Sequence, residues 1–281
     1  MPDTGPTVVL PGRPLTTGEL LDSAVLLLRG QASVLLPLAA VLAAAEQLVL
    51  LPVRIAAGAT APLWLVPDTN ELYIFWFLLA LGAATEAMII VLLGNPAARA
   101  AAKALVGHRS TAADAWGSGG RWGATALLCP AVGAVMLLLA AVLGPAWFAG
   151  FALLGAVAPA LVVDRVAPVR AINRSAALAL RLCGRAAALR VLGYLIWWII
   201  RVGLGWGTFT GLTALGLVTE GWTGALGMLV WAAVNAVAYA ALACLDAVLH
   251  LETRIRTEGL DIRLSRAPGA PRTAELLAVG G

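Results

Sequence analysis

The sequence predicts an all-α polytopic membrane protein with six transmembrane helices. Its residues are 61% hydrophobic and 12% charged, with a mean hydropathy of +0.91, whereas soluble domains carry about 25% charged residues. Its longest apolar runs exceed the roughly 20 residues needed to cross about 30 Å of hydrocarbon. Of the 19 Lys and Arg residues, all but Arg54 and Arg201 fall in four stretches. One stretch precedes the first run, one follows the last run, and the other two lie after the second and the fourth runs.

The N-terminal part predicts an interfacial helix followed by a transmembrane hairpin. Residues 17–29 place leucines at helical spacing, and Glu19 in the first turn favours a helix start. The first span is expected over 31–53 and the second over 71–93. Trp64, in the loop between them, is suited to a headgroup-level anchor.

The middle of the chain predicts a second hairpin. The second span is expected to stop at Gly94-Asn95-Pro96, and a basic helical segment and a Gly-rich connector follow it, up to residue 122. The third span is expected over 123–143 and the fourth over 147–163. Gly144-Pro145 between them permits only a tight hairpin.

The C-terminal part repeats this order. An amphipathic basic segment at 168–185 precedes a fifth span at 189–218, which is longer than a bilayer requires unless it tilts, kinks or breaks. The glycines between 203 and 211 are the expected place for a break. The sixth span is expected over 223–249.

The charge distribution fixes the expected orientation. The four basic stretches fall on one side of the six spans, and positive loops face the cytoplasm. The expected organisation is a cytoplasmic N-terminal tail at 1–16, a transmembrane domain at 17–251 and a charged cytoplasmic C-terminal tail at 252–281. Heavy Ala, Gly and Val usage, with Lys103 as the one lysine, indicates a GC-rich bacterial genome and hence a bacterial cytoplasmic membrane.

A threefold repeat is one interpretation of this order. At an offset of 152 residues, the pattern of Ser, Ala and Leu ending in Arg at 23–29 returns at 175–181, before a span in each case. Each of the three units would be an interfacial segment plus a hairpin. Chance identity among common small and apolar residues is the alternative.

Three stretches share the pattern of one bacterial membrane family. They are Arg13-Pro14-Leu15 with Glu19-Leu20-Leu21-Asp22, then Val162-Val163-Asp164 with Arg174-Ser175-Ala176 and Leu180, and then Leu245-Asp246 with Arg254-Ile255-Arg256 and Glu258-Gly259-Leu260-Asp261. Together they resemble the six-helix family named after the membrane domain fused to some glycerophosphodiester phosphodiesterases. The resemblance implies six helices. It implies no phosphodiesterase activity, because the chain has only two histidines and no soluble domain for metal ligands.

Ionisable groups at membrane depth are the strongest functional signal, since each costs at least about 2.5 to 3.5 kcal/mol when unpaired. Glu46 and Arg201 have matched depths along their spans, so the sequence predicts an intramembrane pair between them. Glu86 lies at a different depth and is expected to be protonated or to face Asn235 or Tyr239. The interpretations left open are simple neutralisation that fixes helix register and a proton or substrate path.

Gly203, Gly207 and Gly211 lie on one helical face and permit close backbone approach. The face could pack within the chain, meet a second copy or a partner helix, or line a substrate-binding kink. A basic segment carries a second candidate surface, made of Arg170, Arg174, Arg181 and Arg185. It is suited to anionic lipid headgroups or to a cytoplasmic partner.

The sequence contains no catalytic triad, HExxH, P-loop or GxGxxG pattern. It therefore predicts no enzyme activity, metal or cofactor, and the dispersed basic residues predict membrane lipids rather than nucleic acid as partners. The expected function is a non-enzymatic scaffold or regulatory component of a bacterial envelope assembly, with other membrane chains or a second copy as partners. The alternative is a small transporter or lipid-handling protein with a polar path near Glu46, Glu86 and Arg201.

Overall fold

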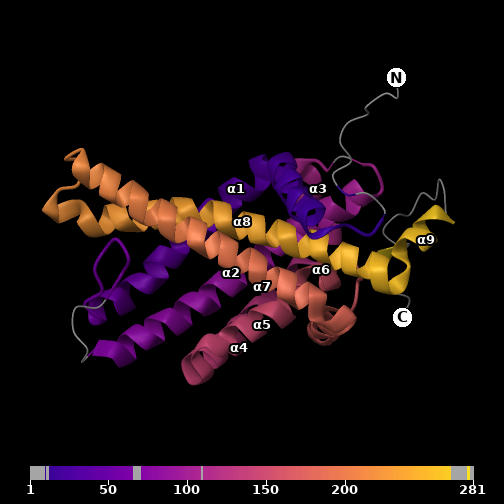
Figure 1. Cartoon of the computed structure of the whole chain (residues 1–281), viewed down its shortest axis with the longest axis horizontal. Coiled ribbons are helices and arrows are strands. Elements are labelled where there is room, and N and C mark those ends of the chain that lie inside the picture. The colour runs from indigo at the N-terminus through magenta and orange to yellow at the C-terminus, as the bar shows by residue number, and fades with distance from the viewer. Residues whose placement is uncertain (1–9, 11–12, 66–70, 109, 267–276, 279–281) are drawn as a thin grey trace.

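The computed structural model describes residue 10 and residues 13–65, 71–108, 110–266 and 277–278. Within these residues the fold is helical, without a β-strand (Figure 1). In chain order the elements, with η for 3-10 turns, are α1 (Thr17–Ala56), α2 (Leu72–Leu105), α3 (Ala112–Trp116), η2 (Ser118–Gly120), α4 (Trp122–Leu143), η3 (Gly144–Ala146), α5 (Trp147–Leu154), α6 (Val157–Val162), α7 (Pro168–Ala214), η4 (Glu220–Trp222), α8 (Thr223–Glu258) and α9 (Leu260–Ser265).

Five helical segments of the described chain are long and apolar enough to cross a membrane. They are α1, α2, the run from α4 to α6, α7 and α8. The predicted all-α class is therefore confirmed for the described residues, and these segments have the length and composition that the predicted membrane class requires. The run Trp122–Val162 contains both the third and the fourth predicted spans, because η3 joins α4 directly to α5.

The hairpin predicted at Gly144-Pro145 is present. α5 folds back on α4 so closely that a Cβ on Gly150 would lie 2.9 Å from the Met136 sulfur. The end of α4 is also bound to α2, since the Trp76 indole donates to the Ala141 carbonyl at 3.0 Å. The returning arm is two short helices, α5 and α6, rather than one continuous span.

Two predicted helix boundaries are wrong because the helices continue. The interfacial segment and first span form the single helix α1, which starts with a capping box between Thr16 and Glu19. α2 runs through Pro96 to Leu105 instead of stopping at Gly94. Asn95 is fully buried there and donates to the Thr125 hydroxyl at 2.8 Å. Neighbouring elements thus hold the helix across a proline that would end an isolated one.

The break in the fifth span lies earlier than the glycines predict. Backbone angles leave the helical region at Arg181–Gly184, with positive φ at Leu182, Cys183 and Gly184. This break lies inside the predicted basic segment at 168–185, ahead of the long apolar arm of α7, and was not predicted from the sequence. The arm then continues without interruption through Gly203 and Gly211, so the break expected at those glycines is absent.

α8 is the central helix of the bundle and runs beside α7 (Figure 1). It also packs against α1, α2 and α6. The sequence ends the last span at residue 249 and starts a tail at 252, but α8 continues to Glu258. Glu252 and Arg254 are fully buried, so this boundary is corrected. Ion pairs, described below, keep these charged residues in the fold.

Contacts between hairpins show which ends lie together. The Trp231 indole at the start of α8 donates to the Pro62 carbonyl in the α1–α2 loop. At the other end of the bundle, the Leu15 carbonyl accepts from Arg185 at 3.2 Å and from Arg256 at 2.6 Å. The segment that precedes α1 therefore lies beside the C-terminal end of α8.

We expect Gly94→Leu to destabilise the fold, because a Cβ on Gly94 would lie 2.8 Å from the Cβ of Ala158 in α6, where no flexible side chain can give way. Overpacking of this kind costs about 1 to 3 kcal/mol. Gly82→Leu on the same helix is the control, since a Cβ there meets no atom within 4 Å. Thermal unfolding in detergent should show a lower melting temperature for Gly94→Leu alone. Equal melting temperatures would contradict the α2–α6 contact.

Candidate functional site

Polar side chains from four helices meet in the apolar interior, and we call this group the membrane cluster. Its members are Glu46 of α1, Thr85 and Glu86 of α2, Tyr194 and Arg201 of α7, and Asn235 and Tyr239 of α8. All except Thr85 are buried, and its three charged residues are at most 8% exposed. The structure thus brings together all five predicted intramembrane polar residues.

The ion pair inside the cluster joins Arg201 to Glu86. A guanidinium nitrogen of Arg201 lies 2.9 Å from Glu86 Oε1. The second guanidinium nitrogen donates to the Tyr194 hydroxyl at 3.1 Å, and that hydroxyl donates to Glu86 Oε2 at 3.0 Å. Tyr194 therefore bridges the two charges and fixes their geometry.

The predicted partner of Arg201 was Glu46, so this pairing is corrected. Matched depth along two helices does not say which faces of those helices meet. Glu46 instead accepts hydrogen bonds from Tyr239 at 2.8 Å and from Asn235 at 3.3 Å. These are the two residues that the sequence assigns to Glu86, so the partners of the two glutamates are exchanged.

Aromatic rings enclose Arg201. Its guanidinium carbon lies 5.4 Å from the centroid of the Tyr194 ring and 5.5 Å from that of Tyr239. Trp147 and Phe151 of α5 pack against the Tyr194 ring in turn. The cation therefore sits between π faces that attract it, in addition to its carboxylate partner.

A second buried pair lies between the membrane cluster and the terminal end of the bundle. Arg190 of α7 and Asp246 of α8 are 2.5 Å apart at their closest atoms, and both side chains are almost fully buried. Arg190 also donates to the Ala152 carbonyl of α5. This pair leaves no room for a side chain at Gly155, where a Cβ would lie 2.8 Å from Asp246 Oδ2.

A larger group, which we call the terminal charge network, lies at the end of the bundle that holds Leu15 and the C-terminal end of α8. Its members are Asp164, Arg174, Arg181, Arg185, His250, Glu252, Arg254, Arg256 and Glu258. Asp164 is at its centre, with His250 at 2.9 Å and Arg254 at 2.7 Å. Arg174 contacts both Asp164 and Glu258.

The charge state of Asp164 follows from these neighbours. Burial raises the pKa of the Asp164 carboxyl, but His250, Arg254 and Arg174 outweigh burial and lower the pKa from 3.8 to about 2. A lowered carboxyl pKa stabilises the folded state above pH 3.8, and this contribution is lost as the pH falls through about 2. Asp164 is therefore an anion at neutral pH and holds the α6–α7 connection against α8.

The predicted interfacial arginines pair mainly inside the chain. Arg174, Arg181 and Arg185 bind carboxylates of α8, namely Glu258 and Glu252. Arg170 is exposed. Lipid headgroups or a cytoplasmic partner were the expected counterparts for all four. The structure gives protein carboxylates to three of them, because α8 extends further than the sequence predicts.

The three stretches that carry the family resemblance converge on the terminal charge network. Leu15 from the first stretch accepts from Arg185 and Arg256 through its carbonyl. Asp164 from the second pairs with Arg254 from the third. Ser175, also from the second, donates to the Leu153 carbonyl at 2.6 Å. These residues therefore share a structural role, which is to fasten the chain ends and the α6–α7 connection.

Asp246, His250 and Arg190 were not recognised as interior polar residues from the sequence. The signal that could have found them is spacing. In α8, Asn235, Tyr239, Asp246, His250 and Arg254 are separated by four or seven residues, as are Arg190, Tyr194 and Arg201 in α7. Such separations return to one helical face, so each helix carries a polar stripe that is buried in the bundle.

The three predicted packing glycines do not pack within the chain. A Cβ added to Gly203, Gly207 or Gly211 would meet no other atom within 4 Å. Of the interpretations left open, internal packing and a substrate-binding kink are therefore wrong. Gly205, between them, faces inward and lies against Trp231 of α8.

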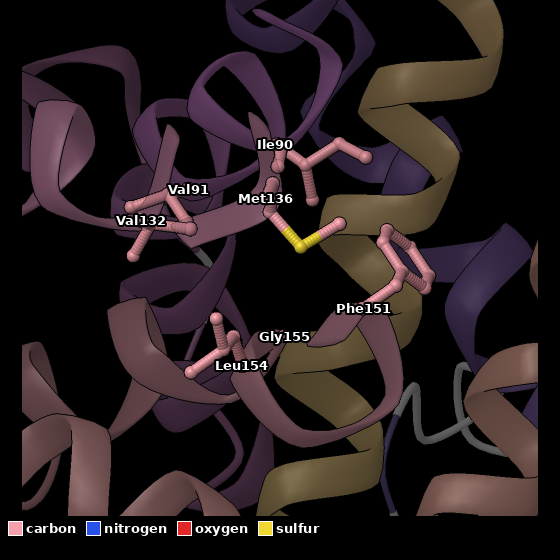
Figure 2. Close-up of a pocket in the computed structure, with 8 residues that line it drawn as sticks. Ile90, Val91, Val132, Met136, Phe151, Leu154 and Gly155 are labelled. Atoms are coloured by element: carbon pink, nitrogen blue, oxygen red, sulfur yellow. The ribbon is translucent and has the colours of Figure 1, made fainter. Parts of the chain in front are cut away.

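A small pocket lies among α2, α4 and α5 and is apolar (Figure 2). It is lined by Ala87, Ile90, Val91, Val132, Met136, Phe151, Leu154 and Gly155. The Met136 thioether reaches across it toward Phe151 (Figure 2). Its lining offers no polar side chain to a substrate. Among the described residues, no group of three or more His, Cys, Asp or Glu side chains is placed to bind a metal ion.

A scan against protein-family models, a search of the curated proteins and a search of the solved structures found no match for this chain.

We expect a double-mutant cycle to couple Glu86 with Arg201. Glu86→Ala strands the buried guanidinium, at a cost of roughly 3 to 5 kcal/mol, whereas adding Arg201→Ala removes the stranded charge and recovers part of the loss. The measurement is thermal unfolding of the four proteins in detergent. The matched control is the cycle of Glu46→Ala with Arg201→Ala, which should be nearly additive. Stronger coupling in the control cycle would restore the pairing predicted from the sequence.

Proposed function

We propose that this chain is a non-enzymatic integral membrane protein that serves as a scaffold or regulatory component of a bacterial cell-envelope assembly. The interior of the bundle supports this proposal, because buried charged side chains form ion pairs between helices there. The outer face of α7 supports it too, because it offers small residues to another helix. The family resemblance of the three stretches is compatible with such a role and stays a prediction.

We also propose six membrane crossings, with both termini in the cytoplasm of a bacterial cell. The return of α5 and α6 along α4 supports a sixth crossing in addition to the five long segments. The positive-inside distribution supports the orientation. The three-unit repeat remains a proposal. It is supported by the segments that form the first turns of α1 and of α7, each ahead of a long apolar arm.

The partner in this proposal is a transmembrane helix of another membrane chain, seated on Gly203, Gly207 and Gly211. In lipid, helices associate through close packing, and small residues four apart let two backbones approach. The three glycines are exposed and have no contact inside the chain. This unoccupied glycine face is the observation that carries the proposal.

A small transporter or lipid-handling protein is the second candidate. The observation in its favour is the membrane cluster, which contains two carboxyl groups, Glu46 and Glu86, for one guanidinium, Arg201. The apolar lining of the pocket does not favour it.

We expect Gly207→Leu to remove partner binding while the chain stays folded. The leucine projects from the centre of the glycine face, where it prevents backbone approach but touches nothing in its own chain. The measurement is co-purification of membrane partners from the native host in mild detergent, combined with thermal unfolding of each variant.

Gly82→Leu is the control, because it adds the same side chain in the middle of α2 without a clash. A partner recovered with the wild type and with Gly82→Leu, but lost with Gly207→Leu, supports the proposal. Recovery of the same partners with all three proteins would contradict it, as would a wild type that brings no partner chain.

A further inference from the structure

The membrane cluster contains one acidic group more than its cations neutralise. Arg201 is engaged by Glu86 at 2.9 Å. Arg54, two turns from Glu46 on α1, donates to Gln47 at 2.9 Å and stacks on the Trp64 ring at 4.1 Å. Within the described residues, Glu46 forms no salt bridge, although it is 4% exposed.

Every helix packed around Glu46 contributes to its environment. The titratable and charged groups that face it are Glu86 of α2, Tyr194 and Arg201 of α7, Tyr239 of α8 and Arg54 of its own helix. Glu86 is a like charge, and the charge of Arg201 is already matched. Arg54 is held against Gln47 and Trp64 and forms no salt bridge with Glu46. Among the described residues an ionised Glu46 would therefore have no cation at salt-bridge distance in an apolar interior, which is strongly unfavourable.

The polar groups around Glu46 include an acceptor for one more hydrogen atom. The Thr85 hydroxyl lies 2.9 Å from Glu46 Oε1, 3.1 Å from the Leu81 carbonyl and 3.0 Å from the Gly82 carbonyl. A hydroxyl donates only one hydrogen. If Thr85 donates to its own helix, its oxygen can accept a hydrogen from Glu46, which only a protonated carboxyl supplies.

Asn235 supplies a second acceptor. Its side chain is 94% buried, its amide nitrogen lies 3.3 Å from Glu46 Oε2, and its carbonyl oxygen has no donor. Turning the amide by half a rotation presents that oxygen to Glu46. The neighbours of Glu46 therefore hydrogen-bond to the carboxyl whether it is ionised or protonated. When it is ionised, acceptor capacity of Thr85 and Asn235 is left unused.

We propose that Glu46 is a proton-binding site at the junction of α1, α2 and α8. The proton removes the surplus negative charge and is donated from Oε1 to Thr85 or from Oε2 to Asn235, while Tyr239 continues to donate to Oε2. Loss of the proton creates a second anion beside Glu86 and weakens the packing of α1 against α2 and α8. Protonation thus controls how firmly these helices are held together, and this does not depend on the proposed partner.

The test uses the full chain in detergent and two matched variants, Glu46→Gln and Glu86→Gln. Infrared spectra of the wild type near neutral pH should show the carbonyl stretch of a protonated buried carboxylic acid. Glu46→Gln should abolish this band and keep the wild-type melting temperature, because glutamine imitates the protonated side chain. Glu86→Gln should lower the melting temperature by several degrees, because it removes the partner of Arg201.

The pH dependence gives an independent readout. The folded protein holds a proton that the unfolded chain releases, so the melting temperature of the wild type should fall as the pH rises through the titration of Glu46. Glu46→Gln should lack that fall. If Glu86→Gln does not fold, the comparison of the wild type with Glu46→Gln still tests whether Glu46 binds the proton.

Several results would overturn the proposal. They are the absence of the acid band in the wild type, persistence of the band in Glu46→Gln, and a marked loss of stability in Glu46→Gln. A melting temperature that depends on sodium concentration at fixed pH, and not on pH itself, would assign the site to a metal cation instead.

Discussion

Charge neutralisation between helices is the constraint on which this fold depends. A charged group in a membrane interior is tolerated only when a partner of opposite sign or several hydrogen bonds accompany it. Asp246 of α8 pairs with Arg190 of α7, and Arg254 of α8 pairs with Asp164. Asn235 and Tyr239 of α8 donate to Glu46 of α1, whereas Arg201 of α7 pairs with Glu86 of α2. Each pairing succeeds only at one register and one rotation of the two helices. The polar stripes therefore specify an arrangement that apolar contacts alone would leave loosely defined.

The network at the terminal end extends this logic to the connections. Asp164 is part of the short link between α6 and α7, and its pairing with Arg254 fastens that link to the end of α8. The same end of α8 holds Leu15 through Arg256. The charged segment from Glu252 to Glu258, which the sequence predicts as part of a tail, is thus packed in the fold as the end of α8. Several residues quoted for the family resemblance contact one another here, among them Leu15 with Arg256 and Asp164 with Arg254.

Composition and periodicity were sufficient to predict the all-helical class, with helices long and apolar enough to cross a membrane, and the hairpin at Gly144-Pro145. They failed where tertiary contacts decide. Pro96 signals a helix end, yet the buried Asn95 holds α2 through it. Depth arguments located Glu46 and Arg201 correctly in the interior but could not give helix rotation, so the wrong glutamate was paired. Tyr194, the bridging residue, carries no charge and was not singled out, although it is seven residues from Arg201 on the same helical face.

The central claim is that the polar stripe of α8 lies in a closed interior between two aqueous sides. Cysteine labelling with a membrane-impermeant reagent tests it most directly, in a Cys183→Ser background because Cys183 is exposed. The account predicts that Leu65→Cys reacts from one side of sealed vesicles, Arg263→Cys from the other, and Tyr239→Cys from neither. Ready reaction of Tyr239→Cys would reveal a water-filled path, and labelling of Leu65→Cys and Arg263→Cys from the same side would contradict the topology.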